Sequence, residues 1–261
     1  MATGCDHTFP PARDHMAQAG LLLARPPDPI GAYRVADMSD TRVLAESQYG
    51  PVTAAAPTRW WLVVAAVAGA LLGPLDLWGQ VASPYPWAHL FNSPAVWAAA
   101  AFAYGTWARH RVAAPVGAVV VLVVAVEAYY LADVLVRGAD RTNLTSPTAF
   151  VWLVAGIVAG LVLGTAGAWV ATPSGWREVL GRAALPAVLG AEATYNVMRI
   201  TTEPADGRPD DLGHFAALLT VLGIAVLVVM IRRTHRCTAV RVAGLAIAAA
   251  VSIGIAAASL I

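Results

Sequence analysis

The segment AAPVGAVVVLVVAVEAYYLADVLV (residues 113–136) is apolar except around Glu127 and Asp133. About 20 apolar residues suffice for an α-helix to cross the ~30 Å hydrocarbon core of a bilayer. An ionisable side chain at that depth costs roughly 2.5–3.5 kcal/mol, so it usually faces a protein interior or a watery cavity. The segment therefore predicts a membrane-spanning helix that forms part of a polar site.

Comparable apolar runs follow one another along the chain. The sequence is 58% hydrophobic and 13% charged, whereas soluble domains usually contain about 25% charged residues. We therefore predict an all-α fold, a polytopic transmembrane helical bundle formed by residues 60–261. The seven predicted spans are residues 60–77, 94–109, 113–136, 149–171, 179–200, 213–231 and 239–260.

The distribution of arginine predicts the orientation of this bundle. Nine arginines flank the spans on one side and only four on the other. Because basic residues are enriched in cytosolic loops, the N-terminus is predicted inside and the C-terminus outside. Residues 1–59 lack sustained periodicity and are predicted to form a disordered cytosolic tail. Met38 is an alternative start to Met1, and the sequence leaves this choice open.

Two glutamates are predicted at the same depth. Glu127 lies about 21 Å and Glu192 about 20 Å from the inner ends of their spans, at ~1.5 Å per residue. Each is followed three residues later by a tyrosine, Tyr130 or Tyr195, which shares its helical face. A neutral carboxyl can donate a proton and an ionised one can accept it, so this pair is a candidate for acid/base chemistry.

Other polar side chains gather in the same outer half of the predicted bundle, while the inner half is almost purely aliphatic. This pattern predicts a polar, aromatic-edged cavity that opens toward the outer leaflet. The candidate catalytic residues are Glu127, Glu192, Tyr130, Tyr195, Asp133 and Asn196. The candidate substrate-binding residues are Asp76, Arg199, Tyr129, Trp78 and His214.

Several classes of function are disfavoured. The sequence has no Gly-rich phosphate loop, no His-Glu-x-x-His and no Gly-x-Ser-x-Gly motif, and we expect neither a metal nor a cofactor. A net charge of +1 argues against a nucleic-acid partner. The expected partners are membrane lipid and a lipophilic small molecule. Gly156, Gly160 and Gly164 lie on one helical face, where another helix of this chain or of a partner could approach closely.

Several stretches together resemble a family of uncharacterised multi-pass membrane proteins common in actinobacteria. They are GPLDLWGQ (73–80), PYPWAHLFNSPAVWAAAAFAYG (84–105), AYYLAD (128–133), SPTAFVWLVAGIVAGLVLGTAGAW (146–169) and AEATY (191–195). The resemblance covers about residues 60–260. It implies the membrane fold and a location in the bacterial inner membrane, and it assigns no reaction and no catalytic residue.

Three functions remain open from the sequence. The first is a membrane-embedded enzyme whose carboxyls protonate a lipophilic alkene or epoxide while aromatic faces stabilise the resulting cation. This is the chemistry of isoprenoid (terpene) cyclisation, by analogy with membrane-embedded meroterpenoid cyclases. The second is a small proton-coupled transporter or permease subunit. The third is a membrane assembly factor that binds a partner helix.

Overall fold

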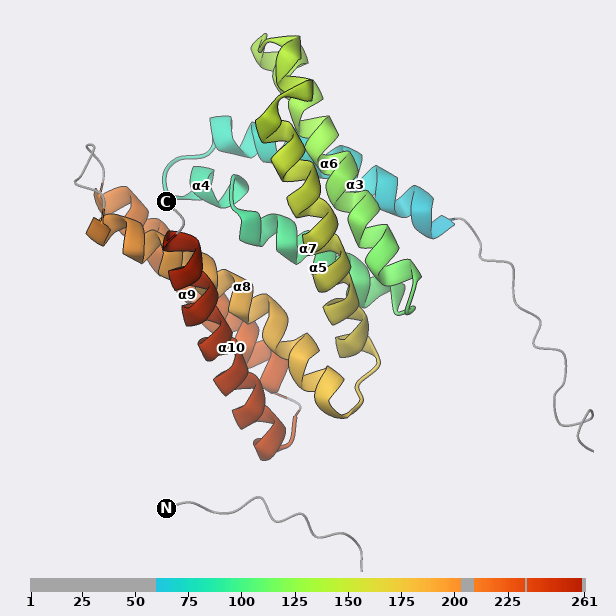
Figure 1. The fold of residues 1–261 in the computed structure, drawn as a ribbon, viewed down its shortest axis with the longest axis vertical. Coiled ribbons are helices and arrows are strands. Elements are labelled where there is room, and N and C mark those ends of the chain that lie inside the picture. Colours follow the sequence, from blue (N-terminus) through green and yellow to red (C-terminus); the bar gives the residue numbers. More distant parts are fainter. Residues whose placement is uncertain (1–59, 203–208, 233, 260–261) are drawn as a thin grey trace, which may run out of the picture. The chain divides into compact units, whose positions relative to one another are not determined.

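The computed structural model describes residues 60–202, 209–232 and 234–259, and the described residues are helical with short connections (Figure 1). The predicted all-α class is therefore confirmed. The prediction for the tail of residues 1–59 falls outside the described residues. The helices are α3 (Trp60–Ala82), α4 (Trp87–Phe91), α5 (Pro94–Ala108), α6 (Ala113–Arg137), η1 (Arg141–Thr145), α7 (Pro147–Ala171), α8 (Gly175–Thr202), α9 (Pro209–Ile231) and α10 (Arg236–Ala258).

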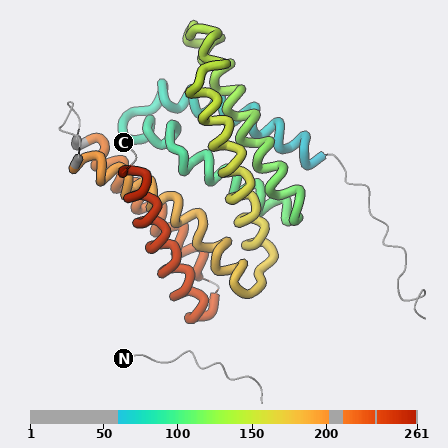
Figure 2. The backbone as a smooth tube through the Cα atoms, in the orientation of Figure 1, coloured from blue at the N-terminus to red at the C-terminus, as the bar shows by residue number. Residues whose placement is uncertain are grey.

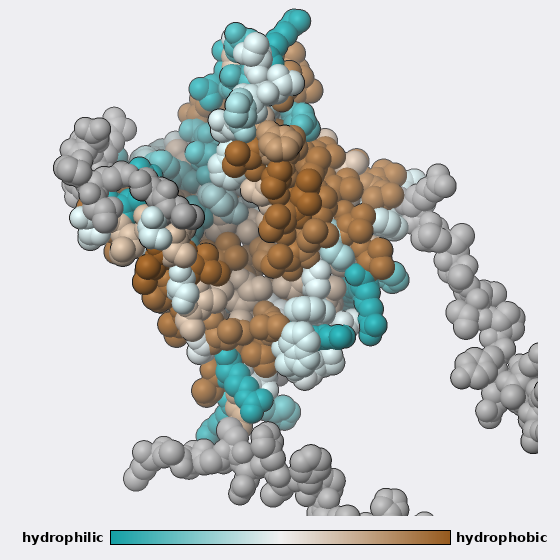
Figure 3. Space-filling view, in the orientation of Figure 1, coloured by the Kyte–Doolittle hydropathy of each residue, from teal (hydrophilic) through white to brown (hydrophobic). Residues whose placement is uncertain are grey.

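Five of these helices are long and apolar enough to cross a membrane, namely α3, α6, α7, α9 and α10. The prediction of a helical membrane protein is confirmed to that extent. Helix α5 has 15 residues, which corresponds to about 22 Å. Helix α8 has 28 residues but carries charged side chains such as Glu178, Arg182 and Arg199. In Figure 3, hydrophobic residues gather in the middle of the visible face and hydrophilic ones at its upper and lower ends.

The long helices form two groups (Figure 2). In the first group, α6 packs against α3, α5 and α7, and α5 also packs against α7. In the second group, α8 packs against both α9 and α10, which touch each other only slightly. Contacts of α8 with α7 and α5 join the two groups. The candidate site lies within the first group.

Glycines let the helices of the first group approach closely. A side chain added at Gly105 of α5 would collide with the backbone of Gly164 on α7. One at Gly160 would meet Val119 of α6 at 2.7 Å. The predicted glycine face of α7 is therefore occupied by helices of the same chain, and Gly156 is also buried there.

Helix α3 differs from its prediction, in which the first span ends at residue 77, shortly after Gly73-Pro74. The helix does not end there but continues to Ala82. Gly73 lies against the backbone of α6 near Ala125 and Tyr129, and this close contact supports the helix through the proline. The added residues include Gln80, whose side-chain amide donates a hydrogen bond to Asp76. The start of α5 agrees with the sequence, because Ser93 caps it and Pro94 occupies its first turn.

Candidate functional site

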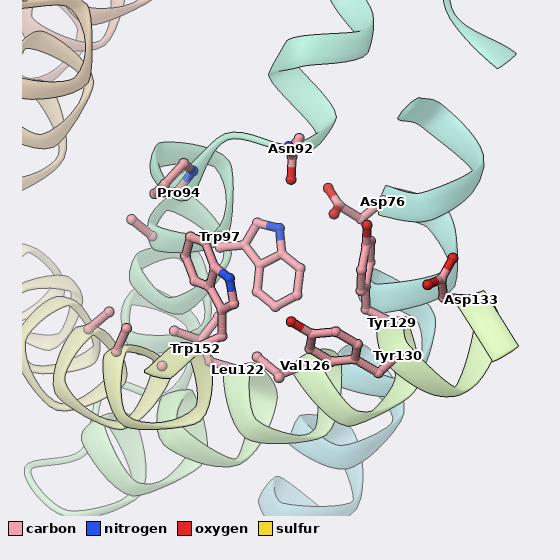
Figure 4. A pocket seen from close by; sticks show the side chains of 14 residues that line it. Asp76, Asn92, Pro94, Trp97, Leu122, Val126, Tyr129, Tyr130, Asp133 and Trp152 are labelled. Atoms are coloured by element: carbon pink, nitrogen blue, oxygen red, sulfur yellow. The ribbon is translucent and has the colours of Figure 1, made fainter. Parts of the chain in front are cut away.

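A cavity of about 280 Å³ lies between α3, α5, α6 and α7 (Figure 4). Its walls combine carboxyl groups, aromatic rings and small or aliphatic side chains. The lining residues are Asp76, Asn92, Pro94, Trp97, Ala98, Leu122, Val126, Tyr129, Tyr130, Asp133, Trp152, Ala155, Gly156 and Ala159.

The carboxyl group of Asp76 is the most deeply buried acid of the cavity, since the residue is only 3% exposed. Its Oδ2 accepts a hydrogen bond from the Gln80 side-chain amide at 3.0 Å. The indole N–H of Trp97 is directed toward the same carboxyl group (Figure 4). Its Oδ1 is buried without a hydrogen-bond partner among the described residues. A buried polar atom without a partner is costly, so this oxygen is a candidate for contact with a ligand.

Aromatic rings surround the space beside this carboxyl group. The Trp97 and Tyr129 rings meet edge to face at a centroid distance of 6.4 Å, and those of Tyr129 and Tyr130 at 5.5 Å. The Tyr129 hydroxyl donates to Gln80 Oε1 at 3.4 Å. The Tyr130 hydroxyl points into the cavity, and Trp152 lies beyond Trp97 on the side away from Asp133 (Figure 4). Such faces attract cations through their π electrons.

Asp133 is the second acid of the cavity. Its Oδ1 lies 3.4 Å from Nε of Arg137, one turn further along α6, where the Arg137 side chain is 53% exposed. Asp133 is therefore balanced by a cation near the surface, whereas Asp76 has neutral partners in the interior. The two carboxyl groups have different environments, as acid/base pairs in enzymes often do.

The structure brings four predicted site residues together, namely Asp76, Tyr129, Tyr130 and Asp133. It does not bring Glu127 to them, because Glu127 is exposed on α6 and outside the cavity lining. The α6 residues that line the cavity begin at Leu122 and recur at helical spacing. Val126 lines the cavity, and Glu127 lies about 100° around the helix from it, on the exposed side of α6.

Glu192, the second predicted catalytic glutamate, contacts the start of α5. Its Oε2 accepts hydrogen bonds from Ser93 Oγ at 2.7 Å and from the backbone N–H of Ala95 at 2.9 Å. A carboxylate is favourable at a helix N-terminus, where backbone N–H groups lack helical partners. Glu192 therefore links α8 to the first turn of α5, and we call this arrangement the Glu192 clamp. It lies outside the cavity lining, so Glu127 and Glu192 do not form a pair at one site.

The remaining predicted residues also lie outside the cavity lining. Asn196 is buried, and its side-chain amide donates to the Glu192 backbone carbonyl at 2.8 Å. The Arg199 guanidinium lies 5.9 Å from the Tyr195 ring centroid, on the same helix. Trp78 and His214 are exposed.

Sequence reasoning did not assign a role in the site to Trp97, Trp152 or Ser93. Trp97 follows the helix cap by four residues, which places it one turn inside α5 at the level of the predicted polar half. Trp152 follows Ser146, the cap of α7, by six residues and lies between one and two turns inside that helix. A search for aromatic residues within two turns of each predicted outer helix end would have found both. The hydrogen bond from Ser93 to Glu192 joins residues 99 positions apart, so no short sequence motif could have predicted it.

Within the part of the chain that the structure describes, no group of three or more His, Cys, Asp and Glu residues is placed to hold a metal ion. Asp76 and Asp133 are the acids that line the cavity.

Comparison with known proteins gives one positive finding. The model of a protein family matches residues 52–260, which include every described residue. No curated protein and no solved structure matches the chain. The family match agrees with the resemblance predicted from the sequence.

Proposed function

The chain belongs to that family, a family of unknown function (DUF6518), and we therefore propose a function from the cavity itself. We propose a membrane-embedded enzyme that performs acid/base chemistry on a lipophilic substrate, with protonation-initiated isoprenoid cyclisation as its reaction. The observation that carries this proposal is the buried Oδ1 of Asp76, which has no hydrogen-bond partner among the described residues and lies beside aromatic rings.

Asp76 replaces Glu127 and Glu192 as the proposed acid. Its Oδ2 is held as an acceptor by Gln80, so a proton on this carboxyl group belongs on Oδ1. That oxygen has no described protein group to receive the proton. A substrate double bond or epoxide oxygen in the cavity would be its acceptor.

The aromatic rings suit the cation that follows. Protonation of a double bond places the proton on one carbon and leaves the other electron-deficient. A second double bond of the same chain then attacks it and forms a carbon–carbon bond. The faces of Trp97, Tyr129 and Tyr130 would stabilise the positive charge. Loss of a proton from the product cation to the Asp76 carboxylate restores the acid, so product and substrate are isomers.

The proposal includes seven spans, with the N-terminus inside, in the inner membrane of a bacterium. In this arrangement α5 and α8 cross the bilayer with the five more apolar helices. If the seven helices cross in alternating directions, the arginines concentrate at the inner helix ends, which supports this arrangement. The described arginines at the inner ends are Arg109, Arg111, Arg177, Arg182, Arg232, Arg236 and Arg241, and those at the outer ends are Arg137, Arg141 and Arg199.

The reaction can be tested with the full-length protein in lipid nanodiscs in D₂O, supplied with geranyl- and farnesyl-length polyprenes and their terminal epoxides. Mass spectrometry should find a product with one carbon-bound deuterium when a double bond is protonated. From an epoxide, it should find an isomer with a new exchangeable hydroxyl. Asp76→Asn should abolish either product, because an amide donates protons poorly.

Two variants control this experiment. Asp76→Glu should retain measurable turnover, since it keeps a carboxyl group in the cavity. Asp140→Asn should be indistinguishable from wild type, because Asp140 is an exposed acid at the η1 cap. Equal turnover by wild type and Asp76→Asn would refute the assignment of the acid, and absence of product from all substrates would refute this cyclisation.

A proton-coupled transporter is the second candidate. It is favoured by the division of the helices into two groups that meet along α8, because transport requires two parts that can move relative to each other. In that case Asp76 would bind and release the coupled proton. Uptake into proteoliposomes that disappears when the proton gradient is collapsed would support transport over catalysis.

A further inference from the structure

The cavity changes in polarity along its length. Asp76 and Asp133 lie at one end and Leu122 at the other, and the Tyr130 hydroxyl points from the first end toward the middle (Figure 4). On α6 the lining runs from Leu122 to Asp133, a distance of about 16 Å at ~1.5 Å per residue. The space is therefore a slot with a polar end and an apolar end.

The walls formed by α5 and α7 carry no charged side chain. On α7, the lining passes from Trp152 to the small residues Gly156 and Ala159. On α5, it passes from Pro94 at the helix start to Ala98. The volume of the slot is about 280 Å³. This capacity suits a head group and one short chain.

The charges of the polar end limit the kind of head group. The ionisable side chains of the lining are Asp76, Asp133, Tyr129 and Tyr130, and no arginine or histidine is among them. Arg137 is the nearby cation, and it pairs with Asp133. A phosphate or carboxylate head would leave water without a lining cation to balance its charge, and it would repel Asp76 in the ionised form that follows proton transfer, which costs free energy.

The apolar surface around one side of the slot indicates how a ligand enters. Trp152 lines the slot and is also 43% exposed. Its neighbours Phe150, Val151 and Val154 on α7 are exposed as well. A ligand can therefore reach the slot from an apolar surface, where it would be dissolved in lipid.

From these observations we infer that the slot binds a single-chain amphiphile with an uncharged or cationic head at Asp76 and its hydrocarbon chain toward Leu122 and Ala159. This inference rests on the proposed function and names its substrate class, an isoprenoid-like chain without a free phosphate or carboxylate.

The test uses decyl compounds that differ only in the head group. Full-length protein in nanodiscs is titrated with ω-bromodecanol, which quenches tryptophan fluorescence, and the quencher is then displaced by decanol, N,N-dimethyldecylamine, decanoate or decyl phosphate. Empty nanodiscs correct for partition into lipid. Decanol and the amine should displace the quencher at concentrations at least about tenfold lower than the two anions. Asp76→Asn should reduce this preference.

A matched pair of variants on α7 tests the position of the chain. Ala159→Phe fills the apolar end of the slot and should weaken displacement by every decyl compound about tenfold without changing their order. Val158→Phe changes an exposed neighbour and should leave all four compounds unchanged, which also controls for insertion and folding. Equal or tighter binding of the anions, equal effects of the two variants, or no saturable quenching would overturn the inference. The series involves no turnover, so its failure is distinct from a failure of the deuterium experiment.

Discussion

The Glu192 clamp allows a quantitative prediction. Glu192→Ala removes the acceptor of two hydrogen bonds, from Ser93 Oγ and Ala95 N. Hydrogen bonds to a charged group contribute about 1.5–3 kcal/mol each. Ala95 N keeps a second partner, because it also donates to Ser93 Oγ at 3.2 Å. Ser93 is only 1% exposed, so its hydroxyl would lose its acceptor in the interior.

We therefore expect Glu192→Ala to lower the free energy of unfolding by about 3 kcal/mol. For a domain of this size, that corresponds to a fall in Tm on the order of 10 °C. Glu192→Gln should cost less, because its amide oxygen still accepts but carries no net charge. Glu178→Gln is a matched control on α8, since Glu178 pairs with Arg182 on the same helix. Glu178→Gln should cost less than Glu192→Ala, because Arg182 keeps its hydrogen bond to the Met230 carbonyl.

The assay is reversible unfolding in mixed micelles, followed by tryptophan fluorescence. Ser93→Ala and the double variant complete a thermodynamic cycle with Glu192→Ala. Because the two side chains share one bond, their effects should be less than additive by about 1 kcal/mol or more. The reasoning fails if Glu192→Ala is as stable as Glu178→Gln, or if the effects of Ser93→Ala and Glu192→Ala simply add.

Two further predictions concern packing and pH. Gly105→Ala should destabilise the protein by about 1–3 kcal/mol in the same assay, since the new methyl group collides with Gly164. The control is Gly244→Ala on α10, where a methyl group meets nothing within 4 Å, so this variant should be neutral or stabilising. Equal effects of the two variants would exclude the backbone contact at Gly164 as the cause of the destabilisation. Burial lowers the pKa of His89 and the Asp211 charge partly opposes this, so the unfolded chain takes up this proton first as pH falls below about 6.5. Stability should therefore decrease as pH falls from 7 to about 5, and His89→Gln should reduce that slope; an unchanged slope would rule out His89 as its source.

The helices were predictable because their length is set by apolar runs. The third predicted span, residues 113–136, differs from α6 by one residue, and the second, residues 94–109, also differs by one from α5. The largest error at a single helix end is at α3, which was predicted to end at residue 77, but packing of Gly73 on α6 carries the helix to Ala82.

The site was only partly predictable, because hydropathy does not determine how a helix is rotated about its axis. Helix α6 is apolar on nearly every side, so the sequence could not decide whether Glu127 or Asp133 faces the interior. Glycines on its neighbours decide it, since Gly69 contacts α6 near Val121 and Gly160 contacts it at Val119. These contacts turn Tyr129, Tyr130 and Asp133 inward and leave Glu127 at the surface.

Helix α8 contributes no side chain to the lining of the cavity, yet the Glu192 clamp ties it to the turn that carries Pro94 and precedes Trp97. Under the proposed function, a change on α8 would therefore alter turnover without altering any residue that lines the cavity. Mutational surveys restricted to the cavity walls would miss such positions. Within the family, selectivity could diverge through α8 while the lining residues stay the same.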